Sequence, residues 1–320
     1  MNQVDHIDKA EKLVAVIATG GTIASMRDES GAAKPSLTGE NLLSGLSADH
    51  IALKPVELMA KDSSSLTISD MQTISNAVAA ELADPEISGV VVLHGTDAME
   101  ETSLLVHLQH RLKKPVVFTG AQFTADNLQA DGPENLSAAI AAAANAANAE
   151  KGVLLCFGGK LLPVWGLYKR SADERDAFEL AGPAAIAASP EMSAAVDAIR
   201  VDIVAIHPGC EATHIDASLD AGARGIVLSA LGSGNANARV VQAVKRCAEK
   251  GVPVVVSSRV PVGRLVAGYG GGGGGHDMGE VGAVHSRTLR PGQARILLAS
   301  LIASSAGREE IERAFNDFAL

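Results

Sequence analysis

The chain has 320 residues, a formal net charge of -10 and a pI of about 5.4. No stretch gathers Lys and Arg on one face, which argues against nucleic acid or an anionic membrane surface as a partner. Hydrophobic residues make up 47% of the chain but aromatic residues only 3%, so we expect an aliphatic core. No apolar run approaches the ~20 residues that a membrane-spanning helix needs.

Strand-like and helical segments alternate through the first half of the chain. Short apolar runs predict buried strands at 13–17, 89–93, 115–119 and 153–157. Helices are expected from 38 or 39 onward and at 69–82, 97–112 and 133–149. Ser69 and Gln72 have the spacing of a capping box at the start of the second helix. This order is typical of βαβ units and predicts a mostly parallel sheet covered by helices.

The second half repeats the pattern on a smaller scale. Strands are expected at 203–206, 225–229 and 253–257, and helices at 235–250, 293–304 and 308–318. The pattern weakens in between, so we predict an N-terminal domain at 1–182, a linker at 183–201 and a C-terminal domain at 202–320. The predicted fold class is therefore α/β, with a larger N-terminal and a smaller C-terminal parallel-sheet domain. A run of six glycines, Gly270 to Gly275, is costly to order and predicts a flexible loop within 268–279.

The cysteines and the first residues bear on the cellular compartment. Cys156, Cys210 and Cys247 are widely spaced and odd in number, which indicates free thiols in a reducing compartment. Residues 1–12 are polar and lack the apolar core of a secretory signal. Together these features predict a cytoplasmic protein.

Two of the predicted strands are followed by a Gly–Thr turn, at 20–22 and at 95–97. An open α/β sheet places its chemistry just beyond the carboxyl ends of its parallel strands, so the two hydroxyls are expected at one edge. A threonine hydroxyl becomes an effective nucleophile only when a base takes its proton. Asp97 provides a carboxylate beside Thr96. The alternative is that Thr96 caps the following helix and Asp97 complements its dipole.

Two further groups of polar residues have two interpretations each, and a pair of acids has one. Burial can lower the pKa of a lysine enough to make it a base, which would suit Lys169, but a solvated loop lysine is the alternative. The three hydroxyls of Ser63, Ser64 and Ser65, which follow Asp62, could bind a carboxylate, or they could form a turn and capping cluster. Glu100 and Glu101 fall in the first helical turn, where the dipole favours acids.

Residues 18–24, with the sequence ATGGTIA, and 94–102, with the sequence HGTDAMEET, resemble the two signature motifs of bacterial-type L-asparaginases and glutaminase-asparaginases. Supporting matches lie at 120–121, 131–133, 135–136, 232–235, 257–261 and Gly263. The resemblance covers roughly residues 11 to 316. It implies two α/β domains in a homotetramer, a dimer of dimers, with active sites between the domains of paired subunits. It implies no metal and no organic cofactor.

By the same resemblance, the nucleophile is Thr22 and a second triad consists of Thr96, Asp97 and Lys169, with the lysine helping to deprotonate Thr96 or its water. The implied substrate-binding residues are Ser63 and Ser64 for the α-carboxylate, Asp97 for the α-ammonium, Gly95, Thr96 and Ala121 around the side-chain amide, and Asn235 from a neighbouring subunit. The implied reaction is hydrolysis of L-asparagine to L-aspartate and ammonia through an acyl-enzyme. The same fold acting on glutamine, D-asparagine or a non-amino-acid amide is an alternative, and a non-catalytic small-molecule sensor is another.

The chain departs from the family pattern in two places. The family usually carries a tyrosine on the first lid loop, but 24–38 contains none, and the only tyrosines are Tyr168 and Tyr269. The acidic residue that a neighbouring subunit contributes has no clear match, with Asp277 and Glu280 as stand-ins. We hypothesise that Tyr269 enters a neighbouring subunit's site and replaces the lid tyrosine. The alternative is that it packs at an interface, where tyrosine is enriched.

Overall fold

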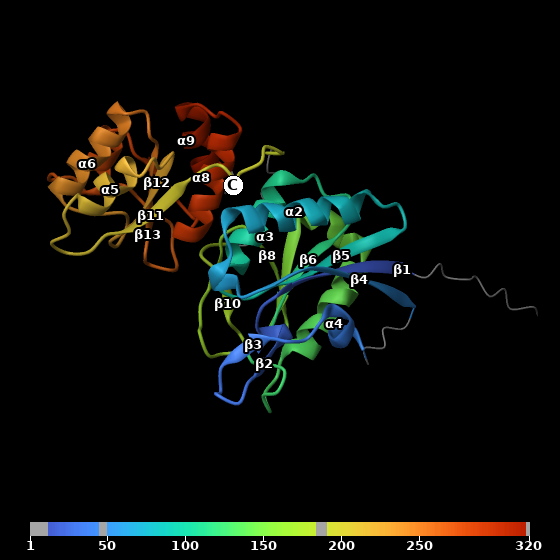
Figure 1. Ribbon diagram of the computed structural model, residues 1–320. Coiled ribbons are helices and arrows are strands. Elements are labelled where there is room, and N and C mark those ends of the chain that lie inside the picture. The colour runs from blue at the N-terminus through green and yellow to red at the C-terminus, as the bar shows by residue number, and fades with distance from the viewer. Residues whose placement is uncertain (1–11, 45–49, 184–190, 318–320) are drawn as a thin grey trace, which may run out of the picture.

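The computed structural model describes residues 12–44, 50–183 and 191–317 and has the predicted α/β class. Figure 1 shows an N-terminal part built on a large sheet and a C-terminal part built on a smaller one. None of the described helices has the length and apolar character needed to cross a membrane. Cys156, Cys210 and Cys247 are free and buried, as predicted.

The N-terminal sheet consists, in spatial order, of β4 (Ile51–Lys61), β1 (Lys12–Gly20), β5 (Ile87–Leu93), β6 (Val116–Thr119), β7 (Val153–Phe157) and β8 (Lys160–Pro163). The first five are parallel, and β8 returns antiparallel to β7. The predicted strands of this half are confirmed. Strand β4 was not predicted, because Lys54, Pro55 and Glu57 interrupt its apolar pattern. An edge strand tolerates such residues, since one side of it has no partner strand.

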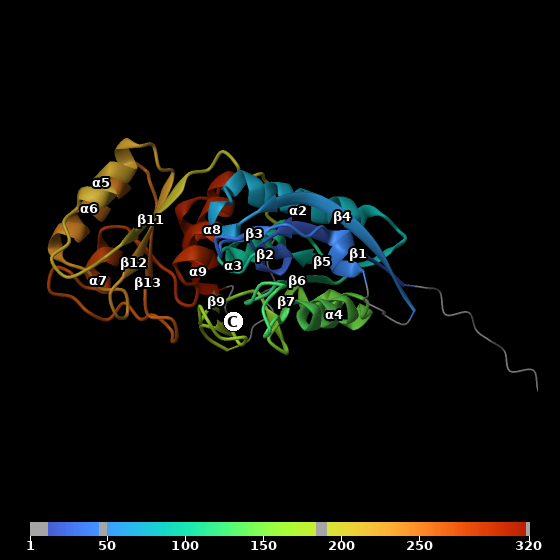
Figure 2. The same cartoon turned by 60° about the horizontal axis from the view of Figure 1, so that its bottom comes forward.

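Helices cover both faces of this sheet (Figure 2). They are α2 (Ile68–Ala83) and α3 (Met99–Gln109) on one face and α1 (Gly39–Leu43) and α4 (Gly132–Ala143) on the other. Alternation along β1 explains the arrangement. Ile17 packs in one core cluster with Ile74 of α2, whereas Val16 packs in another with Ile140 of α4. The uninterrupted apolar run of β1 therefore serves two cores, as in a sheet buried on both sides.

The start of helix α2 differs from the prediction. The capping box is formed by Thr67 and Asp70, not by Ser69 and Gln72. Thr67 Oγ1 accepts from Asp70 N–H at 3.1 Å, and Asp70 Oδ2 accepts from Thr67 N–H at 2.8 Å. Gln72 is buried instead and donates to the side chain of Gln109 at 3.1 Å. Both pairs fit the capping pattern in sequence, and tertiary burial of the glutamine decides between them.

The C-terminal sheet is all parallel, in the order β11 (Val201–Ala205), β12 (Gly225–Ala230), β13 (Val254–Ser258) and β14 (Val284–His285). Helices α5 (Thr213–Asp220) and α6 (Ala238–Glu249) cover one face, with α8 (Pro291–Ala303) and α9 (Arg308–Asp317) on the other side. Helix α6 begins later than predicted because the Asn237 side chain caps it, accepting from Arg239 N–H and Val240 N–H. Helix α5 was not predicted. The last residue of the predicted final helix lies outside the described residues.

Helix α8 packs against both the C-terminal sheet and the N-terminal part. Figure 1 shows it between the C-terminal sheet and α3. Its Leu297 shares a buried cluster with Val227 of β12 and with Leu105 of α3. Met192 and Val196, from the described part of the predicted linker, join the same cluster. Residues 184–190 lie outside the described residues, and the predicted boundaries remain a prediction.

The glycine-rich segment is more structured than its composition predicts. The Asp277 carboxylate accepts from Gly272 N–H at 2.8 Å and Gly274 N–H at 2.9 Å. A short helix, α7 (Gly275–Glu280), begins inside the glycine run. Asn235 Oδ1 accepts from Gly275 N–H at 3.2 Å. One acid and one amide thus accept from three backbone N–H groups that a glycine run would otherwise leave to solvent.

Candidate functional site

Most of the predicted site residues follow the carboxyl ends of four neighbouring strands. Thr22 follows β1, Ser63 follows β4, Thr96 follows β5 and Ala121 follows β6. These strands are parallel and adjacent, so their carboxyl ends lie along one edge of the sheet. Such an edge is where open α/β sheets bind ligands.

The two Gly–Thr turns touch each other through their glycines. A Cβ on Gly21, whose φ is 83°, would lie 2.5 Å from both the N and the Cα of Gly95. A Cβ on Gly95 would lie 2.5 Å from Ser63 Oγ. No side chain fits at either glycine. The backbone therefore holds Thr22 and Thr96, the next residue in each turn, on adjoining segments beside Ser63.

Lys169 reaches this edge from a separate hairpin. Its Nζ lies 2.8 Å from Thr96 Oγ1 and 2.8 Å from Asp97 Oδ1. Thr96 is buried, Lys169 is half-buried and Asp97 is exposed. The residue that caps α3 is Ala98, without a side-chain hydrogen bond, so the capping interpretation of Thr96 is wrong. The solvated-loop interpretation of Lys169 is wrong as well. A lysine amine between a hydroxyl and a carboxylate can help to move a proton from that hydroxyl.

The three serines at 63–65 differ in burial and in hydrogen bonding. Ser63 is buried, and its Oγ accepts from Asp97 N–H at 3.1 Å, which leaves its own hydroxyl proton free to be donated. Ser64 is exposed beside it. Ser65 Oγ donates to Asp62 O at 2.7 Å, which fits the turn interpretation for that residue alone.

The loop after β6 is fixed against the first turn. Ala121 is buried. Both carboxylate oxygens of Asp131 accept from the backbone N–H of Gln122, each at 3.0 Å. A Cβ on Gly132 would lie 2.9 Å from Ile23 Cγ1 and 3.4 Å from Ala121 Cβ. Ala121 is therefore packed beside the residue that follows Thr22. The acid at 131 is needed as an acceptor for the loop, and the glycine at 132 is needed because no side chain fits there.

Sequence reasoning missed His94, whose only signal was its place in the 94–102 motif. The ring is fully buried, and Nδ1 lies 2.7 Å from the Gly95 carbonyl oxygen. Burial lowers the pKa of His94 to about 4, so the imidazole is neutral near pH 7. Because the carbonyl can only accept, Nδ1 carries the hydrogen. His94 thus fixes the peptide that precedes Thr96 without adding charge.

Glu100 and Glu101 make contacts that the dipole argument did not predict. Glu100 Oε2 accepts from Lys169 N–H at 2.6 Å. Glu101 forms an ion pair with Arg295 of helix α8. Burial raises the pKa of both carboxyl groups, that of Glu100 to about 7. No pattern in the sequence links these acids to residues so far along the chain.

The segment after Thr22 forms a hairpin. Strand β2 (Ser25–Arg27) pairs antiparallel with β3 (Ala33–Pro35). Hydrogen bonds from Lys34 and Ser30 lower the pKa of Asp28, in the turn, to about 2. The hairpin has an acidic, hydrogen-bonded tip and no tyrosine.

Asn235 and Tyr269 lie in the C-terminal part. The Asn235 side chain is hydrogen-bonded there to Gly275 N–H, and Tyr269 is 66% exposed. Asp277 is already engaged by two N–H groups of the glycine run. The described contacts therefore join eight of the predicted residues at the sheet edge or beside it and leave Asn235, Tyr269 and Asp277 outside it.

Two family models together cover nearly the whole chain. The Asparaginase, N-terminal model matches residues 13–199, and the Glutaminase/Asparaginase C-terminal domain model matches residues 200–315. The chain belongs to the asparaginase family. The two models meet inside the predicted linker.

Relatives within the asparaginase family are similar along their full length. A probable L-asparaginase of Deinococcus radiodurans is 32% identical, with 94% of this chain and 96% of the relative covered. A probable periplasmic L-asparaginase of Haemophilus influenzae is 28% identical, with 95% and 93% covered. The crystal structure of a probable cytoplasmic L-asparaginase from Campylobacter jejuni superposes with a TM-score of 0.86 at 26% identity, covering 95% of this chain and 99% of that one. The relatives thus include proteins named for two compartments.

Proposed function

We propose that this asparaginase-family protein hydrolyses the side-chain amide of L-asparagine to L-aspartate and ammonia. The observation that carries the proposal is the position of Lys169 Nζ, 2.8 Å from both Thr96 Oγ1 and Asp97 Oδ1, beside the turn that presents Thr22. Amide hydrolysis needs a nucleophile, a route for its proton and donors for the developing oxyanion. This edge of the sheet offers groups for each task. The Deinococcus radiodurans and Haemophilus influenzae relatives are both named as probable L-asparaginases.

In the proposed reaction, Thr22 Oγ attacks the amide carbon, and its proton passes to the amide nitrogen. The C–N bond breaks, the nitrogen leaves as ammonia carrying that proton, and an ester forms on Thr22. Water activated by Thr96 and Lys169 then cleaves the ester, which releases aspartate and restores the Thr22 hydroxyl. Splitting the reaction at a covalent intermediate replaces one difficult step by two easier ones.

The same edge provides groups for binding an amino acid. We assign the α-carboxylate to Ser63 and Ser64 and the α-ammonium to Asp97. Asp97 Oδ1 already accepts from Lys169, which leaves Oδ2 for the ammonium group. Gly95, Thr96 and Ala121 would surround the side-chain amide. In this assignment a single carboxylate orients both the catalytic lysine and the substrate.

We further propose a homotetramer in the cytoplasm, in which Asn235 and Tyr269 complete the site of a neighbouring subunit. Tyr168, the other tyrosine, is buried and donates its hydroxyl to Glu179 at 2.9 Å. Burial, and then Glu179, raises the pKa of Tyr168 to about 12, so this phenol does not exchange protons near neutral pH. Tyr269 is the exposed one of the two.

Replacing Tyr269 by phenylalanine should lower kcat by on the order of 10²-fold, as expected when a general acid–base group is lost. The ring is kept, so the change removes only the hydroxyl. Steady-state ammonia release from L-asparagine measures the effect, with gel filtration to verify the assembly. Unchanged turnover in an intact assembly would show that Tyr269 only packs at an interface.

An ammonia-release panel tests the activity and the substrate together. L-Asparagine, L-glutamine, D-asparagine and a simple aliphatic amide are compared at equal concentration. The highest kcat/KM is expected for L-asparagine. A higher value for another amide would reassign the substrate within the same reaction. If no amide releases ammonia while calorimetry detects asparagine binding, the protein is a sensor and not an enzyme.

A further inference from the structure

The hairpin that carries Lys169 is not part of the large sheet. Among the described residues, strands β9 (Leu167–Lys169) and β10 (Phe178–Leu180) pair only with each other, with Lys169 opposite Phe178. The lysine must nevertheless meet Thr96, which is fixed by β5. Its position therefore depends on what anchors the hairpin.

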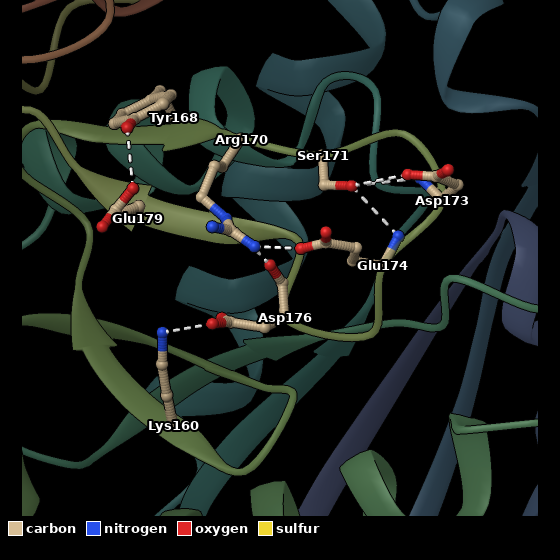
Figure 3. A network of polar contacts seen from close by, with 8 residues as sticks. All are labelled: Lys160, Tyr168, Arg170, Ser171, Asp173, Glu174, Asp176 and Glu179. Atoms are coloured by element: carbon tan, nitrogen blue, oxygen red, sulfur yellow. Dashed lines mark hydrogen bonds and ion pairs between the residues drawn. The ribbon is translucent and has the colours of Figure 1, made fainter.

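Figure 3 shows the polar contacts on the outer side of this hairpin. Arg170 pairs with Glu174, and Ser171 Oγ donates to Asp173. A single ion pair between Lys160 and Asp176, 2.7 Å apart, reaches back to β8. These two ion pairs and one hydrogen bond are exposed, and an exposed ion pair contributes on the order of 0–1 kcal/mol to the free energy of unfolding. They stiffen the hairpin loop but are too weak to set the position of the lysine.

The buried side of the hairpin packs Leu167 and Phe178 into the N-terminal core, and the first turn of α3 fixes its Lys169 end. Glu100 Oε2 accepts from the backbone N–H of Lys169 at 2.6 Å. The same segment supplies the oxygens of Thr96 and Asp97 that receive Lys169 Nζ. Residues 96–100 therefore hydrogen-bond to Lys169 both at its backbone N–H and at its side-chain amine.

A glutamine of the C-terminal part, Gln293, hydrogen-bonds both to the chain entering the hairpin and to helix α3. Gln293 of α8 is fully buried, and its Oε1 accepts from Gly166 N–H at 2.8 Å. Its Nε2 donates to Val164 O at 2.6 Å and to Glu100 O at 3.1 Å. The amide thus joins the chain entering β9 to the residue that holds Lys169.

The N-terminus of α8 also lies against the two acids of α3. A Cβ on Gly292 would lie 3.2 Å from Glu100 Oε1 and 3.1 Å from Glu101 Oε1, so the helix end approaches both carboxyl groups closely. Arg295, one turn along, pairs with Glu101. A helix N-terminus stabilises nearby negative charge. These contacts fix the direction in which α8 presents Gln293.

We propose that Glu100 and Gln293 are positioning residues through which helix α8 of the C-terminal part holds the Lys169 amine against Thr96 of the same chain. This inference rests on the proposed function, because it assigns the lysine a part in the reaction. The C-terminal part then sets the catalytic geometry of its own chain as well as any contribution to a neighbour. A displacement of the lysine by about 1 Å can cost on the order of 10²-fold in rate.

Glu100→Leu, Glu100→Gln and Gln293→Leu test the proposal in the full chain. Leucine removes the acceptor for Lys169 N–H, whereas glutamine retains a carbonyl oxygen there. We expect Glu100→Leu and Gln293→Leu to lower kcat by roughly 10-fold to 10²-fold, with KM changed by less than about 2-fold. Glu100→Gln should keep most of kcat.

Leu297→Ala is the matched control, because it opens a cavity in the same helix at the same interface without touching the hydrogen bonds. It should lower Tm and leave kcat close to that of the unaltered chain. The proposal is overturned if Gln293→Leu lowers kcat no more than Leu297→Ala, or if KM rises instead. An unaltered chain that releases no ammonia would refute the proposed function, which is a different outcome.

The pH dependence of stability provides a second readout. Burial raises the pKa of Glu100 from 4.5 to about 7, opposed by the Lys169 N–H and amine and assisted by Glu101, which itself faces Arg295. Between these pKa values the folded chain binds more protons than the unfolded chain, so its stability falls as pH rises through the window. Glu100→Gln cannot ionise. Its Tm relative to the unaltered chain should therefore rise between about pH 5 and about pH 8, and a constant difference would show that Glu100 is solvated.

Discussion

Replacing Thr22 by valine should reduce ammonia release from L-asparagine by on the order of 10⁴-fold or more, the scale seen when a triad loses a member. Valine has nearly the shape of threonine and removes only the hydroxyl. Thr22 is half-buried in a short 3-10 turn, so the substitution should shift Tm little. The measurement is steady-state kinetics, with thermal unfolding to verify the fold.

Thr19→Val is the control for this prediction. Thr19 stands near the end of the same strand, and its buried hydroxyl donates to Leu93 O at 2.7 Å. Its loss should lower Tm, because Leu93 O loses a buried partner, and should leave most of the activity. If Thr22→Val keeps more than about a tenth of the rate while Thr19→Val does not, the nucleophile has been assigned to the wrong threonine. Thr22→Ser should retain part of the rate, because it retains a hydroxyl.

The sheet edge could be predicted because it depends on local pattern. Uninterrupted apolar runs at 13–17 and 89–93 indicate strands buried on both faces, and parallel strands end at a common edge. The glycines of the two turns mark close backbone approach, which the structure shows between Gly21 and Gly95. From these features alone the sequence places Thr22 and Thr96 together.

The anchoring of Lys169 could not be predicted in this way. Gln293 and Glu100 are 193 residues apart, and the lysine is 73 residues from Thr96. A glutamine in an Ala- and Leu-rich helix looks the same in sequence whether it faces solvent or bridges three segments. Only the packing of α8 against both α3 and the C-terminal sheet reveals its partners. Likewise, nothing local distinguishes the acids at 100–101 from ordinary helix-start acids.

Lys169→Met should lower kcat by about 10² to 10⁴-fold, the range for loss of acid–base assistance, with KM little changed. Methionine keeps the unbranched shape, so the change removes the ammonium group alone. Lys61→Met is the matched control. Lys61 is the last residue of β4, at the same edge of the sheet, but its ammonium group pairs with Asp70, 2.6 Å away. That exposed pair contributes on the order of 1 kcal/mol or less, so the rate should persist.

Chemical rescue separates an acting amine from a structural one. Lys169→Ala leaves room for a small primary amine, and added ethylamine should restore part of the rate in proportion to its concentration if the amine takes part in proton transfer. Ethylamine should have no effect on Thr22→Val. A Lys169→Met rate within about 10-fold of the unaltered chain, below the usual range for acid–base assistance, would mean that the contacts to Thr96 and Asp97 serve the fold and not the reaction. In that case Glu100 and Gln293 would position nothing catalytic, and the water that cleaves the ester would need another activating group.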